Sequence, residues 1–263
     1  MTSELSAFYE TDGQGGLSPR AEARSPWAED MMHGRLLAGI AARHVEQNHQ
    51  SAEFQPARLT IDLFRSPTMD TVGCSSTVVR DGRRIRVVQV DLTVGNADVA
   101  RATVVLMRTS LHPSGEVWSR KDWVVPNPEE IPAPPNSGAK SVTSLDLRPI
   151  DGQGMGSSGQ RKVWLRDLRP LVEGESTSAF SRAVMAADMA SPLGNSGSEG
   201  LAFINADITV YLGRLPRGEW IGLEVGAHIG ADGIAVSRSD LFDLEGPFGF
   251  TDVCAVATPR MGA

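Results

Sequence analysis

An internal repeat constrains this chain of 263 residues more than any other feature of its sequence. Arg65-Ser66-Pro67 closes one stretch of alternating apolar residues, and Arg214-Leu215-Pro216 closes another 149 residues later. The same offset carries Asp81-Gly82, a strong hairpin signal, to within two residues of Asp232-Gly233. Two copies of one structural unit therefore cover most of the chain, which indicates an internal duplication.

Each copy begins with apolar residues at helical spacing and continues as four alternating stretches. In the first copy, a helix is expected from about residue 31, followed by strands at 55–67, 71–79, 85–94 and 99–107. In the second copy, a helix is expected over 178–189, followed by strands at 201–212, 220–227, 234–242 and 248–257. An antiparallel sheet wrapped around a largely apolar helix buries both elements economically. The predicted class is α+β, with two antiparallel sheets each wrapped around a central helix.

The two copies are separated by a segment rich in proline and glycine. Five prolines lie between Pro126 and Pro135, and four glycines lie between Gly152 and Gly159. This composition predicts a connector without helices or strands, and the Gly154–Gly159 match to a dinucleotide-binding pattern is discounted there. We expect an N-terminal unit over 1–109, a connector over 110–162 and a C-terminal unit over 163–263. Their sheets are expected to form one continuous surface.

Composition and charge exclude several classes of protein. A net charge of −7 argues against general nucleic-acid binding. No apolar run approaches about 18 residues, and Met1–Glu10 has no feature of a signal peptide, so we expect a cytoplasmic protein without a membrane span. Cys74 and Cys254 are too few for a disulfide scaffold or a structural zinc site, and we expect free, buried thiols.

Motifs in both copies resemble one known family. They are the segments 58–67, 79–84 and 99–103 in the first copy, and 170–175, 187–188, 203–210 and 217–220 in the second. In content and order these motifs resemble the double-hotdog acyl-CoA thioesterases, in particular the thioesterase II (TesB-like) type and its actinobacterial thioesterase-like branch. The resemblance covers about 30–110 and 163–260.

The resemblance implies a double hotdog, which is two hotdog folds in one chain with their sheets side by side and a helix in each. It implies hydrolysis of fatty acyl-CoA to fatty acid and CoA, with no metal or redox cofactor. Acyl-CoA is then the expected partner, and a homodimer is the expected assembly.

Thioester hydrolysis needs a base that activates water and donors that stabilise the oxyanion at the carbonyl. In the family, an Asp, a Thr or Ser and a Gln together position the water. Asp207 fits the Asp position, since it lies seven residues before Arg214. The equivalent residue in the first copy is Arg58, so one catalytic carboxylate is expected per chain. A solvated strand carboxylate is the alternative interpretation of Asp207.

The other two family positions differ here. The Thr or Ser position falls at Ala227 or His228, and the Gln position falls at Val253 or Cys254. An imidazole near neutrality can orient or deprotonate water, so His228 is a candidate catalytic residue, or else a histidine at a strand end. Neither Val253 nor Cys254 replaces the paired donor and acceptor of a carboxamide.

His33-Gly34-Arg35 opens the first helix where the family has a glycine-rich turn. Gly34 is the candidate oxyanion residue, because glycine lets a carbonyl approach the unpaired amides of a helix N-terminus. His33, Asn205 and Thr209 are candidate substrate-binding residues. Period-two spacing puts Asn205 and Thr209 on the same side of the strand as Asp207.

Three functions compete at this stage. The first is an acyl-CoA thioesterase that works through Asp207, and the second is a catalytically degenerate hotdog protein that binds acyl-CoA or acts as a scaffold. The third is a hotdog hydratase, but the Asp-x-x-x-x-His dyad expected of such an enzyme has no clear copy in this sequence. The run Arg80, Arg83, Arg84 and Arg86 is either a solvated turn or a contact for CoA phosphates.

Overall fold

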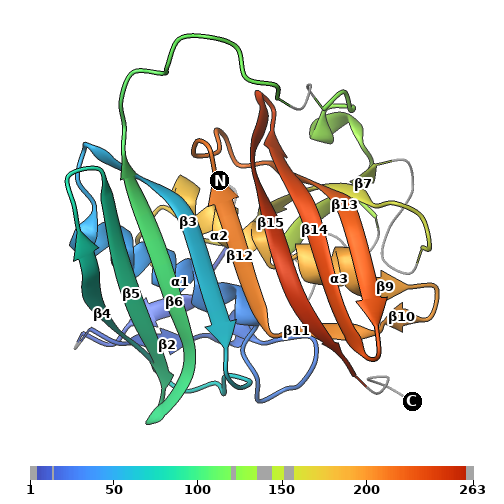
Figure 1. Cartoon of the computed structure of the whole chain (residues 1–263). Helices are drawn as coiled ribbons and strands as arrows, with labels where there is room; N and C mark the ends of the chain where they lie inside the picture. Colours follow the sequence, from blue (N-terminus) through green and yellow to red (C-terminus); the bar gives the residue numbers. More distant parts are fainter. Residues whose placement is uncertain (1–4, 14, 120–122, 135–143, 151–156, 259–263) are drawn as a thin grey trace.

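The computed structural model describes residues 5–13, 15–119, 123–134, 144–150 and 157–258. Within these residues, thirteen strands form one antiparallel sheet, and the helices cover one of its faces (Figure 1). The strand order is β1-β2-β4-β5-β6-β3-β12-β15-β14-β13-β8-β7, with β11 paired to β15 beside β12. The predicted continuous sheet is confirmed, and the two copies meet where β3 pairs with β12.

The first copy contributes six strands and one long helix. They are β1 (Tyr9–Thr11), β2 (Leu17–Pro19), α1 (Gly34–His49), β3 (Phe54–Leu63), β4 (Val72–Asp81), β5 (Ile85–Val94) and β6 (Ala97–Arg108). Buried side chains at spacings of three and four, such as Leu36, Leu37 and Ile40, hold α1 against the sheet.

The second copy contributes the remaining strands and two short helices. They are β7 (Leu145–Ile150), β8 (Lys162–Asp167), α2 (Ala179–Ala187), α3 (Ala190–Asn195), β9 (Ser196–Gly197), β10 (Gly200–Leu201), β11 (Phe203–Asn205), β12 (Asp207–Leu212), β13 (Ile221–Ala231), β14 (Ile234–Asp243) and β15 (Gly246–Ala257). The helix expected over 178–189 is α2, which ends at Ala187, and the short helix α3 that follows it was not expected. The strand expected over 201–212 is divided at Ala206. The small hairpin β9–β10 stands apart from the main sheet.

The pairing of β3 with β12 marks the centre of the duplication. Thr60 lies directly opposite Thr209, and their hydroxyl oxygens are 3.1 Å apart. These two residues are 149 positions apart in sequence, which is the offset of the repeat. The two copies are therefore related by an approximate two-fold axis through this pair of threonines.

Each copy carries a β-bulge at the same place in the repeat. The pairing of β3 with β6 shifts between Pro56 and Arg58. In the second copy, the register along β15 slips by one residue between Asn205 and Thr209, on either side of Ala206. A bulge reverses the alternation of side chains between the two faces of the sheet. As a result, Asn205 faces the helices whereas Asp207 and Thr209 face away from them.

The core lies between the sheet and the helices, and α1 packs against α2. A Cβ placed on Gly39 of α1 would lie 2.7 Å from the sulfur of Met185 in α2, so the glycine permits close packing of the two helices. Ser181 of α2 donates a hydrogen bond to the Gly39 carbonyl. No helix in the described part of the chain is long and apolar enough to cross a membrane.

The segment 110–162 differs from the expectation of a connector without regular structure. β7 lies inside it and pairs along its whole length with β8. Among the described residues, β7 is the last strand of the sheet and has one unpaired edge, so Pro149 is tolerated in it. The Gly154–Gly159 pattern begins outside the described residues, so the structure describes only part of that motif.

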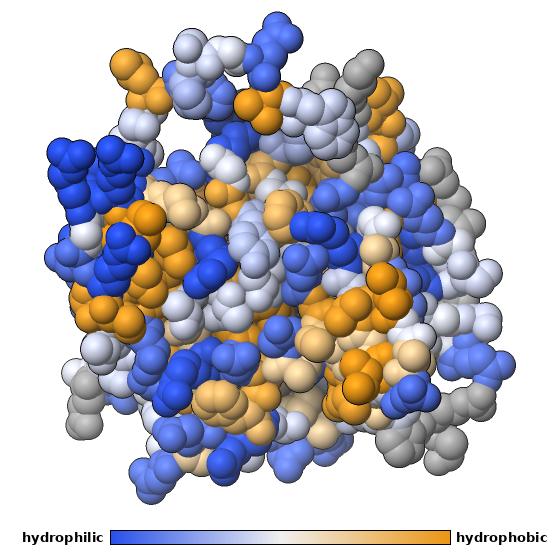
Figure 2. Space-filling model, viewed as in Figure 1, coloured by the Kyte–Doolittle hydropathy of each residue, from blue (hydrophilic) through white to orange (hydrophobic). Residues whose placement is uncertain are grey.

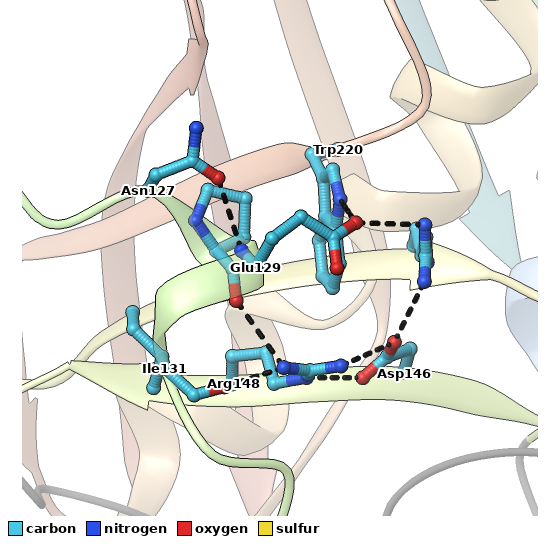
Figure 3. Close-up of polar contacts among 8 residues, drawn as sticks. Asn127, Glu129, Ile131, Asp146, Arg148 and Trp220 are labelled. Carbon is cyan, nitrogen blue, oxygen red and sulfur yellow. Dashed lines mark hydrogen bonds and ion pairs between the residues drawn. The ribbon is translucent and has the colours of Figure 1, made fainter.

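Residues 123–131 are fastened to the second copy by a polar network (Figure 3). Arg148 forms two hydrogen bonds with Asp146, at 2.6 and 3.0 Å, and donates to the carbonyl oxygens of Pro128 and Ile131. Glu129 accepts a hydrogen bond from the indole nitrogen of Trp220 at 3.0 Å. This segment therefore forms a fixed strap across strands of the second copy.

The cysteine prediction was half right. Both cysteines are free, and Cys74 is half-buried, with the pKa of its thiol raised by burial to about 12. Cys254 is exposed, because it lies on the face of β15 that no helix covers.

Candidate functional site

The site begins at the N-terminus of α1. His33 caps the helix, and its Nδ1 accepts a hydrogen bond from the Arg35 amide at 3.5 Å. The backbone before the helix is held by bonds from Met32 to the Pro67 carbonyl and from His33 to the Ala23 carbonyl. The first amides of a helix lack intrahelical partners and carry a partial positive charge.

Gly34 leaves space at this helix end. A Cβ at this position would meet only the Cδ1 atom of Leu63, at 3.9 Å, which is an ordinary contact. Among the described residues, no hydrogen bond to the Gly34 amide is found. The amide is therefore available to a ligand that approaches the start of α1.

Asp188 lies opposite this helix end, at the C-terminal end of α2. Its side chain is almost completely buried, and its Oδ1 accepts a hydrogen bond from the amide nitrogen of Asn205 at 3.0 Å. Its Oδ2 lies 3.8 Å from Nδ1 of His33. His33 belongs to the first copy and Asp188 and Asn205 to the second, so the site spans the junction of the two copies.

Burial controls the charges at the site. It raises the pKa of Asp188 to about 6, although the hydrogen bond from Asn205 and the charge of Arg35 oppose this shift. Burial, together with Arg35, lowers the pKa of His33 to about 3. His33 is thus neutral near pH 7, and its 3.8 Å contact with Asp188 is not an ion pair. Asp188 is a carboxylate that ionises close to neutrality.

Arg35 supplies the positive charge at the site. Only 1% of Arg35 is exposed, and its guanidinium forms an ion pair with Asp167 of β8, with 2.5 Å between Nη1 and Oδ1. The guanidinium also lies 5.2 Å from the centre of the Phe8 ring. This buried pair joins α1 of the first copy to the sheet of the second beside Asp188 and His33.

The structure places Asp207 elsewhere. Its side chain is on the uncovered face of the sheet, half-buried, and its Oδ1 accepts a hydrogen bond from the Cys254 amide at 2.6 Å. Burial raises the pKa of Asp207, the Cys254 amide opposes this, and Asp62 and Asp252 raise it further. No described contact joins Asp207 to Gly34.

Two of the other sequence-based candidates also lie apart from Asp188. Thr209 is on the uncovered face of the sheet, where its hydroxyl group forms a hydrogen bond with that of Thr60. The expectation that Asn205 shares a face with Asp207 and Thr209 was wrong, because the bulge at Ala206 turns Asn205 towards the helices. His228 is exposed near the end of β13, where its Nδ1 lies 3.1 Å from Oδ1 of Asn195.

Sequence reasoning missed Asp188 and Arg35 as members of the site. Asp188 was within a motif that resembled the family, but its place depends on the break between α2 and α3, which helical periodicity does not show. Arg35 was seen only as part of the turn that opens α1. Within the described residues, no three His, Cys, Asp or Glu side chains gather in a way that could hold a metal ion.

Both copies match family models of acyl-CoA thioesterases. The model of the N-terminal domain matches residues 23–107, and the model of the C-terminal domain matches residues 123–250. This chain belongs to the acyl-CoA thioesterase family. The C-terminal match begins at Trp123, the first residue of the strap. Among curated proteins, none matches the sequence.

Solved structures support the fold of this thioesterase. A Thermobifida fusca protein assigned as a thioesterase II has a TM-score of 0.75 at 12% identity. The alignment covers 96% of this chain and 97% of the Thermobifida protein. A tesB protein from Mycobacterium avium subspecies paratuberculosis has a TM-score of 0.66 at 14% identity, covering 95% and 96%. An Alicyclobacillus acidocaldarius protein with a hot dog fold has a TM-score of 0.70 at 15% identity, covering 96% of each chain. The thioesterase therefore has a hot dog fold.

Proposed function

We propose that this thioesterase hydrolyses acyl-CoA to a carboxylic acid and CoA, with Asp188 as the general base. The buried carboxyl group of Asp188 carries the proposal, since it faces the N-terminus of α1 across the junction of the copies. A base with a pKa near 6 is ionised at pH 7 and still accepts a proton readily.

The reaction begins when Asp188 takes a proton from water as the water oxygen attacks the thioester carbonyl. Asn205 holds Oδ1 of the carboxylate and leaves Oδ2 for this proton. The carbonyl oxygen becomes an oxyanion, which the Gly34 amide and the α1 dipole stabilise. The carbon–sulfur bond then breaks, and the thiolate of CoA takes the proton from Asp188. The products are the free acid and the thiol.

Asp207 remains the competing assignment for the base, and a pair of matched variants distinguishes the two. Asp188→Asn is expected to lower kcat by about 10²-fold or more, the usual scale for loss of a general base. Asp207→Asn is expected to change kcat by less than about threefold, because its side chain faces away from the helix N-terminus. The measurement is release of free CoA from acyl-CoA. The reverse result would assign the base to Asp207.

A binding protein without turnover is the second candidate function. The Gln position of the family pattern is occupied by Val253 or Cys254, and neither side chain has the paired donor and acceptor of a carboxamide. This function predicts that a non-hydrolysable thioether analogue of acyl-CoA binds, while no CoA is released from any acyl-CoA. Release of CoA that depends on Asp188 would exclude it.

The proposed architecture is a double hot dog, in which α1 is the central helix of the first unit and α2 that of the second. The units correspond to about 1–109 and 163–263, in a cytoplasmic protein.

A homodimer is also proposed. Figure 2 shows apolar atoms gathered over the lower right of the uncovered face, where β11, β14 and β15 carry exposed Ile204, Ile234, Val236 and Val256. Such patches are typical of interaction surfaces, and light scattering that reports only a monomer would reject the dimer.

A further inference from the structure

Four polar groups on the helix-covered side of the second copy have no hydrogen-bond partner among the described residues. They are the hydroxyl groups of Ser237, Ser239 and Thr251 and the side-chain nitrogen of Asn195. All four residues are at most 3% exposed. An unpaired buried polar group destabilises the folded protein, so a cluster of four such groups needs an explanation.

The first copy shows that the fold itself does not need these hydroxyl groups. The residues 149 positions before Ser237, Ser239 and Thr251 are Val88, Val90 and Ala102. All three of these counterparts are completely buried.

The backbone pairing is the same in both copies. Ser239 lies opposite Thr251, as Val90 lies opposite Ala102. Likewise, Ser237 lies opposite Val253, and Val88 lies opposite Val104. One backbone therefore carries apolar side chains in the first copy and unpaired hydroxyl groups in the second.

The polar cluster lies next to the proposed catalytic site. Asn205 of the site pairs with Ala255, and Ala255 pairs with Ala235 on the next strand. Ser237 follows Ala235 by two residues, about 7 Å along the same face of the sheet. On the other side, α3 begins two residues after Asp188 and packs over β13, β14 and β15. The cluster therefore continues from Asp188 into the layer between α3 and the sheet.

We propose that the acyl group of the substrate enters this layer and carries oxygen functions, hydroxyl or carbonyl, beyond the thioester. This inference rests on the proposed function and specifies its substrate class as oxygenated acyl thioesters. Oxygen atoms on the acyl chain pair with Ser237, Ser239, Thr251 and the Asn195 amide, whereas a plain alkyl chain leaves them unpaired. A site that forms hydrogen bonds with a hydroxyl group of its substrate discriminates strongly against an analogue without that hydroxyl group, because the polar groups of the site are then left unpaired.

Entry of the acyl group requires α3 to move away from the sheet. A Cβ placed on Gly194 of α3 would lie 2.7 Å from the Cβ of Ser237, so the helix rests directly on the cluster. Because α3 has six residues and is separate from α2, it can move without displacing the α2 residues that pack against α1.

The first measurement is kcat/KM for matched pairs of substrates, such as octanoyl-CoA against its hydroxy and keto derivatives. We expect the best oxygenated member to exceed the saturated one by about tenfold or more, which corresponds to about 1.4 kcal/mol. Equal kcat/KM values within every pair would overturn this inference and leave the proposed function intact. Hydrolysis of no acyl-CoA at all would overturn the proposed function.

The second measurement separates binding from turnover. The triple variant Ser237→Val, Ser239→Val, Thr251→Ala installs the residues of the first copy, and Thr77→Val removes an exposed hydroxyl on β4 as a control. Thioether analogues of the same pairs are titrated calorimetrically against wild type and both variants. We expect the triple variant to remain folded and to lose the preference, and the control to keep it. A preference that survives the triple substitution would overturn the inference.

Discussion

One residue, Asp188, supplies the buried carboxyl group on which the proposed hydrolysis depends. The pKa of Asp188 is about 6 in the folded protein, against an ordinary value of 3.8. The folded state therefore binds this proton more tightly than the unfolded state. Below about pH 4, Asp188 is protonated in both states and its pKa shift does not change the free energy of unfolding. Between about pH 4 and pH 6 the shift lowers the free energy of unfolding progressively, and above about pH 6 the loss is complete. Two pKa units correspond to roughly 3 kcal/mol.

This linkage predicts a pH-dependent effect of Asp188→Asn. The variant is expected to have a higher Tm than wild type at pH 7.5, because it lacks the buried charge, and no such advantage at pH 4. Thermal unfolding followed by circular dichroism at both pH values measures the difference. Since both proteins contain His33, its own titration cancels. A Tm difference that is the same at both pH values would contradict the raised pKa of the buried Asp188 carboxyl group.

Gly34 provides a second test at this scale. Its replacement by Ala adds a methyl group that meets only Leu63, at an ordinary distance, so the folded protein accommodates it. The exchange of Gly for Ala in a helix is neutral or stabilising. We nevertheless expect kcat/KM to fall by about tenfold or more, because the methyl group occupies the space where the thioester carbonyl approaches. Unchanged activity would remove the Gly34 amide from the oxyanion site.

At the scale of elements, the strap over the second copy is held by aromatic packing. The ring of Trp123 lies 4.5 Å from that of Phe242 and 4.8 Å from that of Trp164, between ring centres. It rests directly on Gly222 of β13, where a Cβ would lie 2.0 Å from the indole. The strap therefore depends on the absence of a side chain at this glycine.

Gly222→Ala is expected to displace Trp123 and to lower the Tm by several degrees, with a change in tryptophan fluorescence. Gly226→Ala on the same strand is the matched control, since its nearest neighbours are at 3.7 and 3.8 Å. If both variants unfold at the wild-type temperature, the strap contributes nothing to stability.

Elements differ in how far the sequence predicts them. The hairpin turns at Asp81-Gly82 and Asp232-Gly233 located the long strands, because turn residues and alternation are local signals. The strand at Leu145–Ile150 was missed, because it lies among prolines and glycines and its pairing with β8 is a tertiary property. The bulge at Ala206 was also missed, since nothing in the local sequence marks it.

At the scale of the whole molecule, the duplication explains both the fold and the position of the site. The offset of 149 residues between Arg65 and Arg214 reappears as the pair Thr60 and Thr209 at the centre of the sheet. The offset does not predict the site, because His33, Asp188 and Asn205 meet only after two helices from different copies pack together. Asp207 was chosen because it fits the Asp position of the family motif, whereas the structure brings Asp188 to the N-terminus of α1.

The pH dependence of kcat/KM shows whether Asp188 is the base. If Asp188 is the base, kcat/KM for an acyl-CoA rises with pH through a midpoint near 6, because the carboxylate form is the active one. Asp188→Asn is expected to abolish this rise and leave a residual rate without it, and Asp207→Asn is expected to keep the rise with an unchanged midpoint. A rise that persists in Asp188→Asn and disappears in Asp207→Asn would assign the base to Asp207 and exclude Asp188.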